Sequence, residues 1–370
     1  LPDGSHTILN RHRIQQSRPT IMLVILFALA SLTHACLEII PVPSQRGILR
    51  DSQGNRFNLQ RLQPYTELFS ANRFRPQGTR MVDIRRNKAF RNPIYRGRFG
   101  STLVQAVTAN NGQVTFAELR RGNRIETTCV RESVQESGIN VTDSFDDAPP
   151  LDIVFGDSLV PPTRRLQVEE DHSSEHVDRR LLSTCDVFTT VKIGIVYDSE
   201  FCGTYGRQNV ARHRIMAILA SASLHYEYDL CVKLQLTDIY SPDSICGGAS
   251  KTFSRFSRDQ RCSRSPNLLT RFTDWMARKR ARYGFDPDAL IHMFSGFDNG
   301  SSLGCAWEGV LCWPRYSYGV EYVTARESIF LQGVIVAHEI GHNLNAPHLG
   351  GGGVGEFIMA PRLSQAMDGF

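Results

Sequence analysis

The feature that most constrains this chain is a His-Glu-Ile-Gly-His segment at residues 338–342, which a third histidine, His348, follows closely. The apolar run Val334-Ile335-Val336-Ala337 precedes it, and the pattern predicts a helix over residues 329–344. On a helix, side chains four residues apart share one face, with Cβ atoms about 5–6 Å apart. The rings of His338 and His342 can therefore reach the same metal ion.

His348 is the candidate for a third ligand, because a catalytic zinc site needs three protein ligands and one open position. Pro347 forbids continuation of the helix, and Asn345 tolerates the left-handed conformation in which helices commonly end. We therefore predict that His338, His342 and His348 bind one Zn²⁺ ion, the cofactor of this chain. The alternative is chance: a His-Glu-x-x-His segment arises in roughly two of a hundred chains of this size and composition, and the third histidine makes coincidence much rarer.

Glu339 is the candidate general base. It follows the first predicted ligand and points slightly aside, so its carboxylate can contact a metal-bound water molecule instead of the metal. Zinc lowers the pKa of such a water molecule to about 7, and a carboxylate can complete its activation. The four residues together predict hydrolysis of an amide bond without a covalent intermediate.

One long apolar run, at residues 21–32, is too short to span a bilayer, which takes about 20 residues. Arginines precede it and Thr33-His34-Ala35 follows it, so we interpret residues 1–35 as an upstream extension with a secretory signal peptide. The alternative is a buried core helix. Secretion places the nine cysteines in an oxidising compartment, where most are expected to be paired and an odd number leaves one without a partner.

Three segments follow the signal. Residues 36–142 read as short strands, including a hairpin around Asn110-Asn111-Gly112, and predict a β-rich prodomain. Residues 143–180 are rich in Asp, Glu, Ser, Pro and Arg, which predicts a disordered linker. Two Arg-Arg pairs lie in it, and a cut after the second pair, Arg179 and Arg180, would release a chain that begins at Leu181.

Residues 181–370 alternate between strand and helix patterns, which predicts an α/β (α+β) domain with a mixed, twisted sheet and an active-site helix. The predicted strands are residues 191–197, 231–236 and 289–294, and the other predicted helices are 208–228 and 268–282. Two further runs, 304–307 and 318–323, are predicted to be edge strands.

Charge and isolated histidines add little functional signal. Residues 181–370 carry equal numbers of basic and acidic side chains, so the whole formal excess of +5 lies in residues 1–180. The arginines there are scattered without interleaved aromatic residues, which favours a solvated basic surface over a nucleic-acid site. We expect no nucleic-acid partner and no membrane span within this chain. The isolated histidines are predicted to be structural or solvated: His172, His176, His213, His225 and His292.

The segment from His338 to His348 resembles the metzincin pattern, and Phe357-Ile358-Met359-Ala360-Pro361 resembles the Met-turn of that clan. Over about residues 186–370, three further runs resemble the reprolysin, or ADAM-type, branch: Phe272-Thr273-Asp274-Trp275, Phe294-Ser295-Gly296 and residues 304–312. The resemblance implies a zincin-like fold and a secreted zinc metalloendopeptidase, made as a zymogen, that cleaves protein or peptide substrates.

The resemblance also assigns supporting roles. Met359 would lie beneath the metal, and the strand Gly304-Cys305-Ala306-Trp307 would accept substrate as an added antiparallel strand. A prodomain cysteine can occupy the open position of the zinc in this family, and Cys129 is the candidate, with a disulfide to Cys36 as the alternative.

The chain departs from the family pattern at Asn345, where Gly is usual, and at Leu349, where the branch usually has Asp. It also stops soon after the Met-turn, where the family's domain normally continues with a cysteine that bonds back. We therefore expect Cys312 to be the unpaired cysteine, and a membrane anchor could follow residue 370.

Two rival interpretations remain. One is a catalytically inactive adhesion or ligand-binding module on the same fold, and the other is a zinc hydrolase of non-peptide amides. Inactive relatives usually lose the glutamate or a histidine, and this chain keeps all four residues.

Overall fold

The computed structural model comprises two compact units, residues 1–35 and 36–370. The residues that it describes all belong to the second unit: 37–42, 46–65, 69–75, 93–109, 112–122, 124–128, 153–154, 187–241, 246, 262, 268–297, 303–324, 327–348 and 357–363. The predicted signal segment therefore lies outside the described residues. Among the described helices, none combines the length and the hydrophobicity that crossing a bilayer requires.

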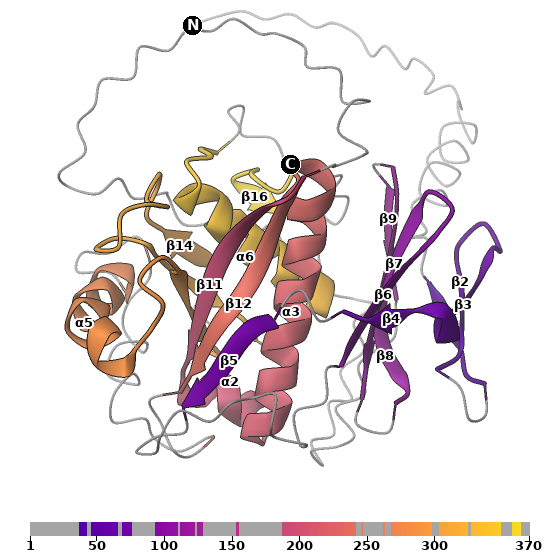
Figure 1. Ribbon diagram of the computed structural model, residues 1–370, viewed down its shortest axis with the longest axis horizontal. Helices are drawn as coiled ribbons and strands as arrows, with labels where there is room; N and C mark the ends of the chain where they lie inside the picture. The colour runs from indigo at the N-terminus through magenta and orange to yellow at the C-terminus, as the bar shows by residue number, and fades with distance from the viewer. Residues whose placement is uncertain are drawn as a thin grey trace, which may run out of the picture. The chain divides into compact units, whose positions relative to one another are not determined.

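A six-stranded sheet in the order β14-β15-β13-β11-β12-β5 supports the predicted site (Figure 1). Parallel pairing joins β11 (Thr189–Tyr197), β12 (Val232–Tyr240), β13 (Leu290–Ser295) and β15 (Tyr318–Tyr322), whereas β14 (Gly304–Ala306) runs antiparallel to β15. Every residue of β13 and β15 is buried, as expected for parallel strands that are covered on both faces. The predicted α/β (α+β) fold with a mixed sheet is confirmed.

One strand prediction was wrong. The run at residues 318–323 was expected at an edge, but β15 lies between β13 and β14. The polar side chain in this run, Glu321, is fully buried in the fold. β14 is the edge strand, as predicted, although it ends at Ala306 instead of Trp307.

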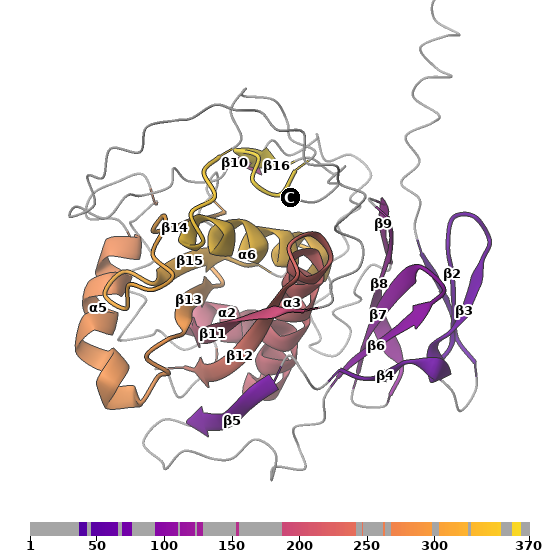
Figure 2. The ribbon, with the colours of Figure 1, turned by 45° about the horizontal axis from the view of Figure 1, so that its top comes forward.

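Helices cover both faces of this sheet (Figure 2). The helices α3 (Gln208–Asp229) and α6 (Ile329–Asn343) pack together in one apolar cluster, which Ile193 and Ile195 of β11 join. The next residue, Val196, faces the second cluster, which is built around α5 (Leu268–Tyr283). Neighbouring residues of β11 thus face opposite clusters, because successive side chains of a strand point to opposite faces of the sheet.

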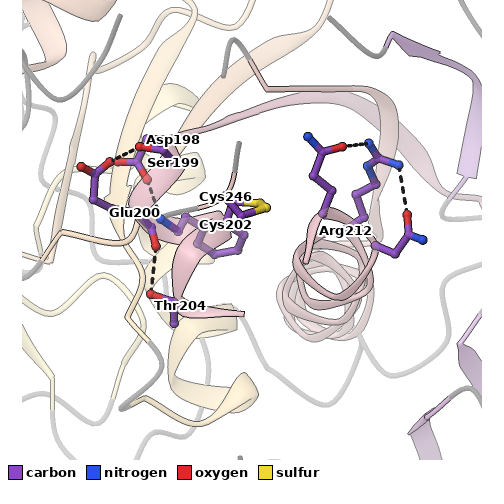
Figure 3. Close-up of a disulfide and its surroundings, with 10 residues drawn as sticks. Asp198, Ser199, Glu200, Cys202, Thr204, Arg212 and Cys246 are labelled. Carbon is purple, nitrogen blue, oxygen red and sulfur yellow. Dashed lines mark hydrogen bonds between the residues drawn. A yellow bond between two sulfur atoms is a disulfide. The ribbon is translucent and has the colours of Figure 1, made fainter. Parts of the chain in front are cut away.

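A short helix, α2 (Ser199–Thr204), follows β11 and is capped by Asp198, whose Oδ1 accepts hydrogen bonds from Phe201 N at 2.7 Å and Gly296 N at 3.1 Å. Figure 3 shows this cap beside the disulfide between Cys202 and Cys246. A Cβ atom on Gly296 would collide with the backbone of Phe201, which explains why a glycine ends the Phe-Ser-Gly run after β13.

The N-terminal segment, residues 37–128, is rich in strands, as predicted. One sheet contains β1 (Glu38–Ile40), β2 (Ile48–Arg50) and β3 (Arg56–Asn58), and the turn η1 (Leu59–Arg61) follows it. The other sheet has the order β4 (Gln63–Pro64), β6 (Ile94–Phe99), β7 (Thr102–Thr108), β8 (Val114–Arg121) and β9 (Arg124–Thr127). The antiparallel pair β7–β8 is the predicted hairpin, and Gly112 in its turn has φ 83°.

Two pairings cross the predicted domain boundaries. The strand β5 (Phe69–Arg75) leaves the N-terminal sheets and pairs in parallel with β12. The short strand β10 (Ile153–Val154), inside the predicted linker, pairs with β16 (Arg362–Leu363), which follows the predicted Met-turn. The remaining residues of the predicted linker, including Arg179 and Arg180, lie outside the described residues.

Buried polar side chains join the N-terminal segment to α3. Arg96 Nη1 lies 2.7 Å from Glu227 Oε2, and Arg120 Nη2 lies 2.6 Å from Asp229 Oδ1. Burial alone would raise the pKa of Glu227, but the charge of Arg96 holds it below its ordinary value. Both guanidinium groups lie at the C-terminal end of α3, where the helix dipole also favours positive charge.

Glu118, in the same contact, makes the stability depend on pH. Its side chain is fully buried, and burial raises its pKa to about 7, although Ser221 Oγ donates a hydrogen bond to its Oε1 at 2.8 Å. The unfolded chain loses this proton near the ordinary value of 4.5, whereas the folded chain keeps it to about 7. Stability should therefore fall as pH rises between these values, on the order of 3 kcal/mol in total.

The substitution Glu118→Gln removes this titration. We expect it to raise the unfolding temperature relative to the wild type much more at pH 8 than at pH 4, since only the wild type carries a buried charge at pH 8. Thermal unfolding of both proteins at the two pH values checks this, with Glu38→Gln at an exposed carboxylate as control. An equal difference at both pH values would contradict the assignment.

Candidate metal centre

The helix α6 begins at Ile329, as predicted, and ends one residue before the predicted end. Ser328 Oγ accepts a hydrogen bond from Leu331 N at 3.2 Å and caps its first turn. The helix ends at Asn343, and Asn345 then has φ 76°, the left-handed conformation that was predicted for it. Because the chain reverses there, it carries His348 back beside the helix.

The three predicted ligands converge through their Nε2 atoms. His338 Nε2 lies 3.0 Å from His342 Nε2 and 3.1 Å from His348 Nε2. One ligand atom from each ring lies within 4.8 Å of the others, which is a group that can hold a metal ion. Two nitrogens at about 2.0–2.1 Å from one tetrahedral ion would be about 3.3 Å apart, close to the separations found.

Backbone carbonyls fix the tautomers of the two helical rings. His338 Nδ1 lies 2.6 Å from Ile358 O, and His342 Nδ1 lies 2.9 Å from Ala346 O. A carbonyl oxygen only accepts, so both Nδ1 atoms carry the proton, and in a neutral ring Nε2 presents a lone pair. Two such lone pairs 3.0 Å apart repel each other unless a cation lies between them. The donor set therefore fits a divalent metal.

Burial keeps these rings in the form that binds metals. Burial and the neighbouring His342 lower the pKa of His338, and burial and His348 lower the pKa of His342 to about 4. Both rings are thus neutral at physiological pH, so a metal ion would not have to displace a proton from Nε2.

Glu339 is fully buried beside the ligands, and within the described part of the chain neither of its carboxylate oxygens has a hydrogen-bond partner. Burial, with the charge of Glu321 as a smaller contribution, raises its pKa well above the ordinary value. A divalent cation at the three histidines would act in the opposite direction and favour the carboxylate. A buried carboxylate without a hydrogen-bond partner at this place is consistent with the predicted role of Glu339 as general base.

The strand β14 lies directly against this carboxylate. A Cβ atom on Gly304 would come 2.5 Å from Glu339 Oε1, so only glycine leaves room for the carboxylate here. The disulfide Cys262–Cys305 anchors the strand.

Met359 is 4% exposed and packs under α6 at Gly341, where an added Cβ would collide with its sulfur atom. The turn around it is closed by a hydrogen bond from Ala360 N to Phe357 O at 3.1 Å. Because Ile358 O also accepts a hydrogen bond from His338 Nδ1, this turn both supports the helix and orients a predicted ligand.

Residues 188–370 match the family model Reprolysin_5, which is described as metallopeptidase family M12. These residues belong to this family. Among curated proteins, the M12 domain is similar to disintegrin and metalloproteinase domain-containing protein B of Aspergillus fumigatus, at 22% identity over 42% of this chain and 20% of that protein. It is also similar to snake venom metalloproteinase TM-1 of Protobothrops mucrosquamatus, at 28% identity over 35% of this chain and 65% of that protein.

The chain thus spans a fifth of the first of these relatives and less than two thirds of the second. A solved structure described as "Structure of a chaperone-substrate complex" aligns at 16% identity, over 46% of this chain and 26% of that chain, with a TM-score of 0.32, too low to support a comparison. The predicted resemblance to the reprolysin, or ADAM-type, metzincins is confirmed by the family match and by the two named relatives.

Not every predicted site residue of the M12 domain lies at the metal centre. Trp307 follows β14, and its Nε1 donates a hydrogen bond to Thr273 Oγ1 of α5 at 2.7 Å, so its ring fills the core on that side. Its backbone is engaged as well, because Trp307 N donates to Tyr318 O at 3.3 Å and Trp307 O accepts a hydrogen bond from Asn343 Nδ2 at 2.7 Å. Cys129, the candidate inhibitory ligand, lies outside the described residues, as do Arg179 and Arg180.

The unpaired cysteine was predicted correctly: among the described cysteines, Cys312 is free and exposed. Cys202 is bonded to Cys246 and Cys262 to Cys305, and Cys231 is disulfide-bonded too.

Sequence reasoning missed one polar group next to the centre. His292 was predicted to be structural or solvated, and it is structural: it contacts Glu321 and Asn343, and all three residues are completely buried. The three are far apart in the sequence, so no local pattern joins them. The only signal was a pair of charged or ionisable residues inside otherwise apolar strands.

Proposed function

We propose that this chain is a zinc-dependent metalloendopeptidase that hydrolyses peptide bonds of protein substrates. The observation that carries the proposal is the convergence of three Nε2 atoms, with two rings held as Nδ1–H tautomers, beside the unpartnered carboxylate of Glu339. Membership of metallopeptidase family M12 supports the same activity.

In this mechanism His338, His342 and His348 hold the zinc ion. A bound zinc ion supplies Lewis-acid chemistry: it lowers the pKa of a coordinated water molecule and polarises the substrate carbonyl. Glu339 accepts the proton of the attacking water at a carboxylate oxygen and then delivers it to the leaving amine, which is general acid–base catalysis. Met359 supports the turn of α6 that carries His338 and His342. No side chain of this protein becomes acylated during the reaction.

The substrate is proposed to bind along β14. Among the strands that the structure describes, this one ends the sheet and pairs only with β15. An extended peptide can therefore add to its outer edge through main-chain hydrogen bonds, which suits many sequences. Because Gly304 lies against Glu339, a peptide on this edge would pass beside the general base.

We further propose that the protein is secreted as a zymogen whose domains are residues 36–142, the linker 143–180 and the peptidase domain 181–370. The signal-like segment before residue 36 and the arginine pairs of the linker support this. So does the docking of the N-terminal segment on α3 through Arg96 and Arg120. Cleavage after Arg180 would activate the enzyme.

The test uses the purified full chain, before and after cleavage at Arg180. We expect about one equivalent of zinc in both forms, hydrolysis of a denatured protein by the cleaved form, and loss of that hydrolysis with a zinc chelator. Zinc analysis and gel electrophoresis of the products measure these results. The uncut Cys129→Ala variant is included, because early activity in it alone would support thiolate inhibition, whereas unchanged latency would contradict that role.

The rival interpretation of an inactive module has its own outcome in this assay. Zinc binding without hydrolysis of any protein substrate after cleavage would favour an inactive adhesion or ligand-binding module. Hydrolysis that survives full removal of zinc would contradict the proposed mechanism itself.

A further inference from the structure

A buried polar chain crosses from the sheet to α6 behind the metal centre. His292 of β13, Glu321 of β15 and Asn343 at the end of α6 are each 0% exposed. His292 Nδ1 forms a short hydrogen bond with Glu321 Oε1, and His292 Nε2 lies 3.0 Å from Asn343 Oδ1. The mechanism above uses none of these three side chains.

The direction of the bonds follows from the other contacts of Asn343. Its Nδ2 donates to Trp307 O at 2.7 Å and to Tyr318 O at 3.3 Å, so its Oδ1 is the acceptor. His292 Nε2 must then carry a proton and donate it to Asn343. The contact between His292 Nδ1 and Glu321 holds one more proton, on the ring or on the carboxyl group.

Asn343 connects the ligand-bearing turn with the substrate strand. It directly follows His342, and the segment after β14 is bound to the same turn: Gly309 N donates to His342 O at 2.8 Å, and Val310 N donates to Asn343 O at 2.9 Å. In the sheet, Glu321 pairs with Gly304, the residue that lies against Glu339. The polar chain therefore meets both the metal-binding helix and β14.

Packing alone does not explain such a chain. A buried ion pair is expensive to desolvate, and apolar residues of similar size would stabilise a core as well or better. The sheet also makes room for the ring, since a Cβ atom on Gly319 would lie 2.5 Å from two atoms of His292. What apolar residues cannot supply is a donor that fixes the orientation of Asn343.

We propose that His292 and Glu321 are positioning residues of the peptidase site, which set the last turn of α6, with His342, against β14 by orienting Asn343. This inference rests on the proposed function. Its chemistry is a fixed hydrogen-bond direction: Glu321 orients the ring of His292, and the ring's Nε2–H orients the amide of Asn343. The amide then holds the carbonyls of Trp307 and Tyr318, which follow β14 and begin β15.

The test compares five full-chain proteins with the wild type: His292→Leu, Glu321→Val, Glu321→Gln, the double variant His292→Leu/Glu321→Val, and the control Thr237→Val. Thr237 donates a buried hydrogen bond to Ile193 O at 3.2 Å in the same sheet. After cleavage at Arg180, each protein is measured for kcat and KM, for zinc affinity by chelator competition, and for unfolding temperature.

We expect His292→Leu and Glu321→Val to lower kcat and zinc affinity about tenfold each, with KM changed less than threefold, as for residues that orient a ligand through another group. Glu321→Gln should stay within about threefold of the wild type, since its amide can donate to a neutral His292 Nδ1 and leave Nε2–H in place. Thr237→Val should change neither kcat nor zinc affinity.

The double variant separates positioning from packing. With both polar groups removed, the unfolding temperature should return to the wild-type value or exceed it, while kcat and zinc affinity stay about tenfold low. Recovery of activity together with stability would overturn the proposal, and so would wild-type kcat and zinc affinity in His292→Leu. A wild type that binds no zinc would instead refute the proposed function, and this inference with it.

Discussion

The variant Glu339→Gln is expected to lose peptide-bond hydrolysis while it keeps its zinc. Removal of the general base should lower kcat by about 10³–10⁴-fold, the upper range for general acid–base catalysis, since zinc alone still activates water poorly. The amide fits the space of the carboxylate, and the three ligands are untouched. In the metal-free protein, loss of a buried, unpartnered carboxylate should leave the unfolding temperature unchanged or raise it.

Three measurements check this expectation on the cleaved protein: zinc content, kcat/KM on one peptide substrate, and the unfolding temperature. Glu200→Gln is the matched control, because Glu200 is a carboxylate of the same domain in α2 that bonds Ser199 instead of facing the ligands. The base assignment fails if Glu339→Gln retains a tenth or more of the wild-type kcat/KM at full zinc occupancy. A loss of zinc in this variant would show instead that the carboxylate helps to hold the metal.

The parts of the site that could be predicted are those set by neighbours in the sequence. The spacing of His338 and His342 fixes one helix face, and Pro347 with the left-handed Asn345 fixes the return of His348. The β7–β8 hairpin was found for the same reason, because an Asn-Gly turn specifies its own geometry.

The parts that were missed depend on pairings between distant residues. Whether β15 is an edge or an interior strand depends on β14, and β5 could join the sheet only because β12 offered an open edge. The partners of His292 come from another strand and from a helix end, so a single polar residue in a strand gave no sign of them. Long-range pairing is fixed by packing, which sequence periodicity does not encode.

The second large effect is expected for His348→Ala. His348 is the one proposed ligand that α6 does not carry, so its loss leaves the helix, Glu339 and the Met359 turn in place. Two imidazoles remain, and zinc affinity should fall at least about a hundredfold, with hydrolysis lost at micromolar zinc. Zinc should raise the unfolding temperature of the wild type by mass action, whereas the same concentration should leave that of His348→Ala unchanged.

His213→Ala, at a histidine of α3 outside the three-histidine group, controls for the loss of any imidazole. Chelator competition and thermal unfolding with and without zinc measure both proteins. The comparison with Glu339→Gln is informative, because both variants should be inactive for different reasons. Glu339→Gln should bind zinc but lack the general base, whereas His348→Ala should keep Glu339 but fail to bind zinc. If His348→Ala bound zinc as tightly as the wild type, two histidines of α6 would suffice and the three-ligand centre would be wrong.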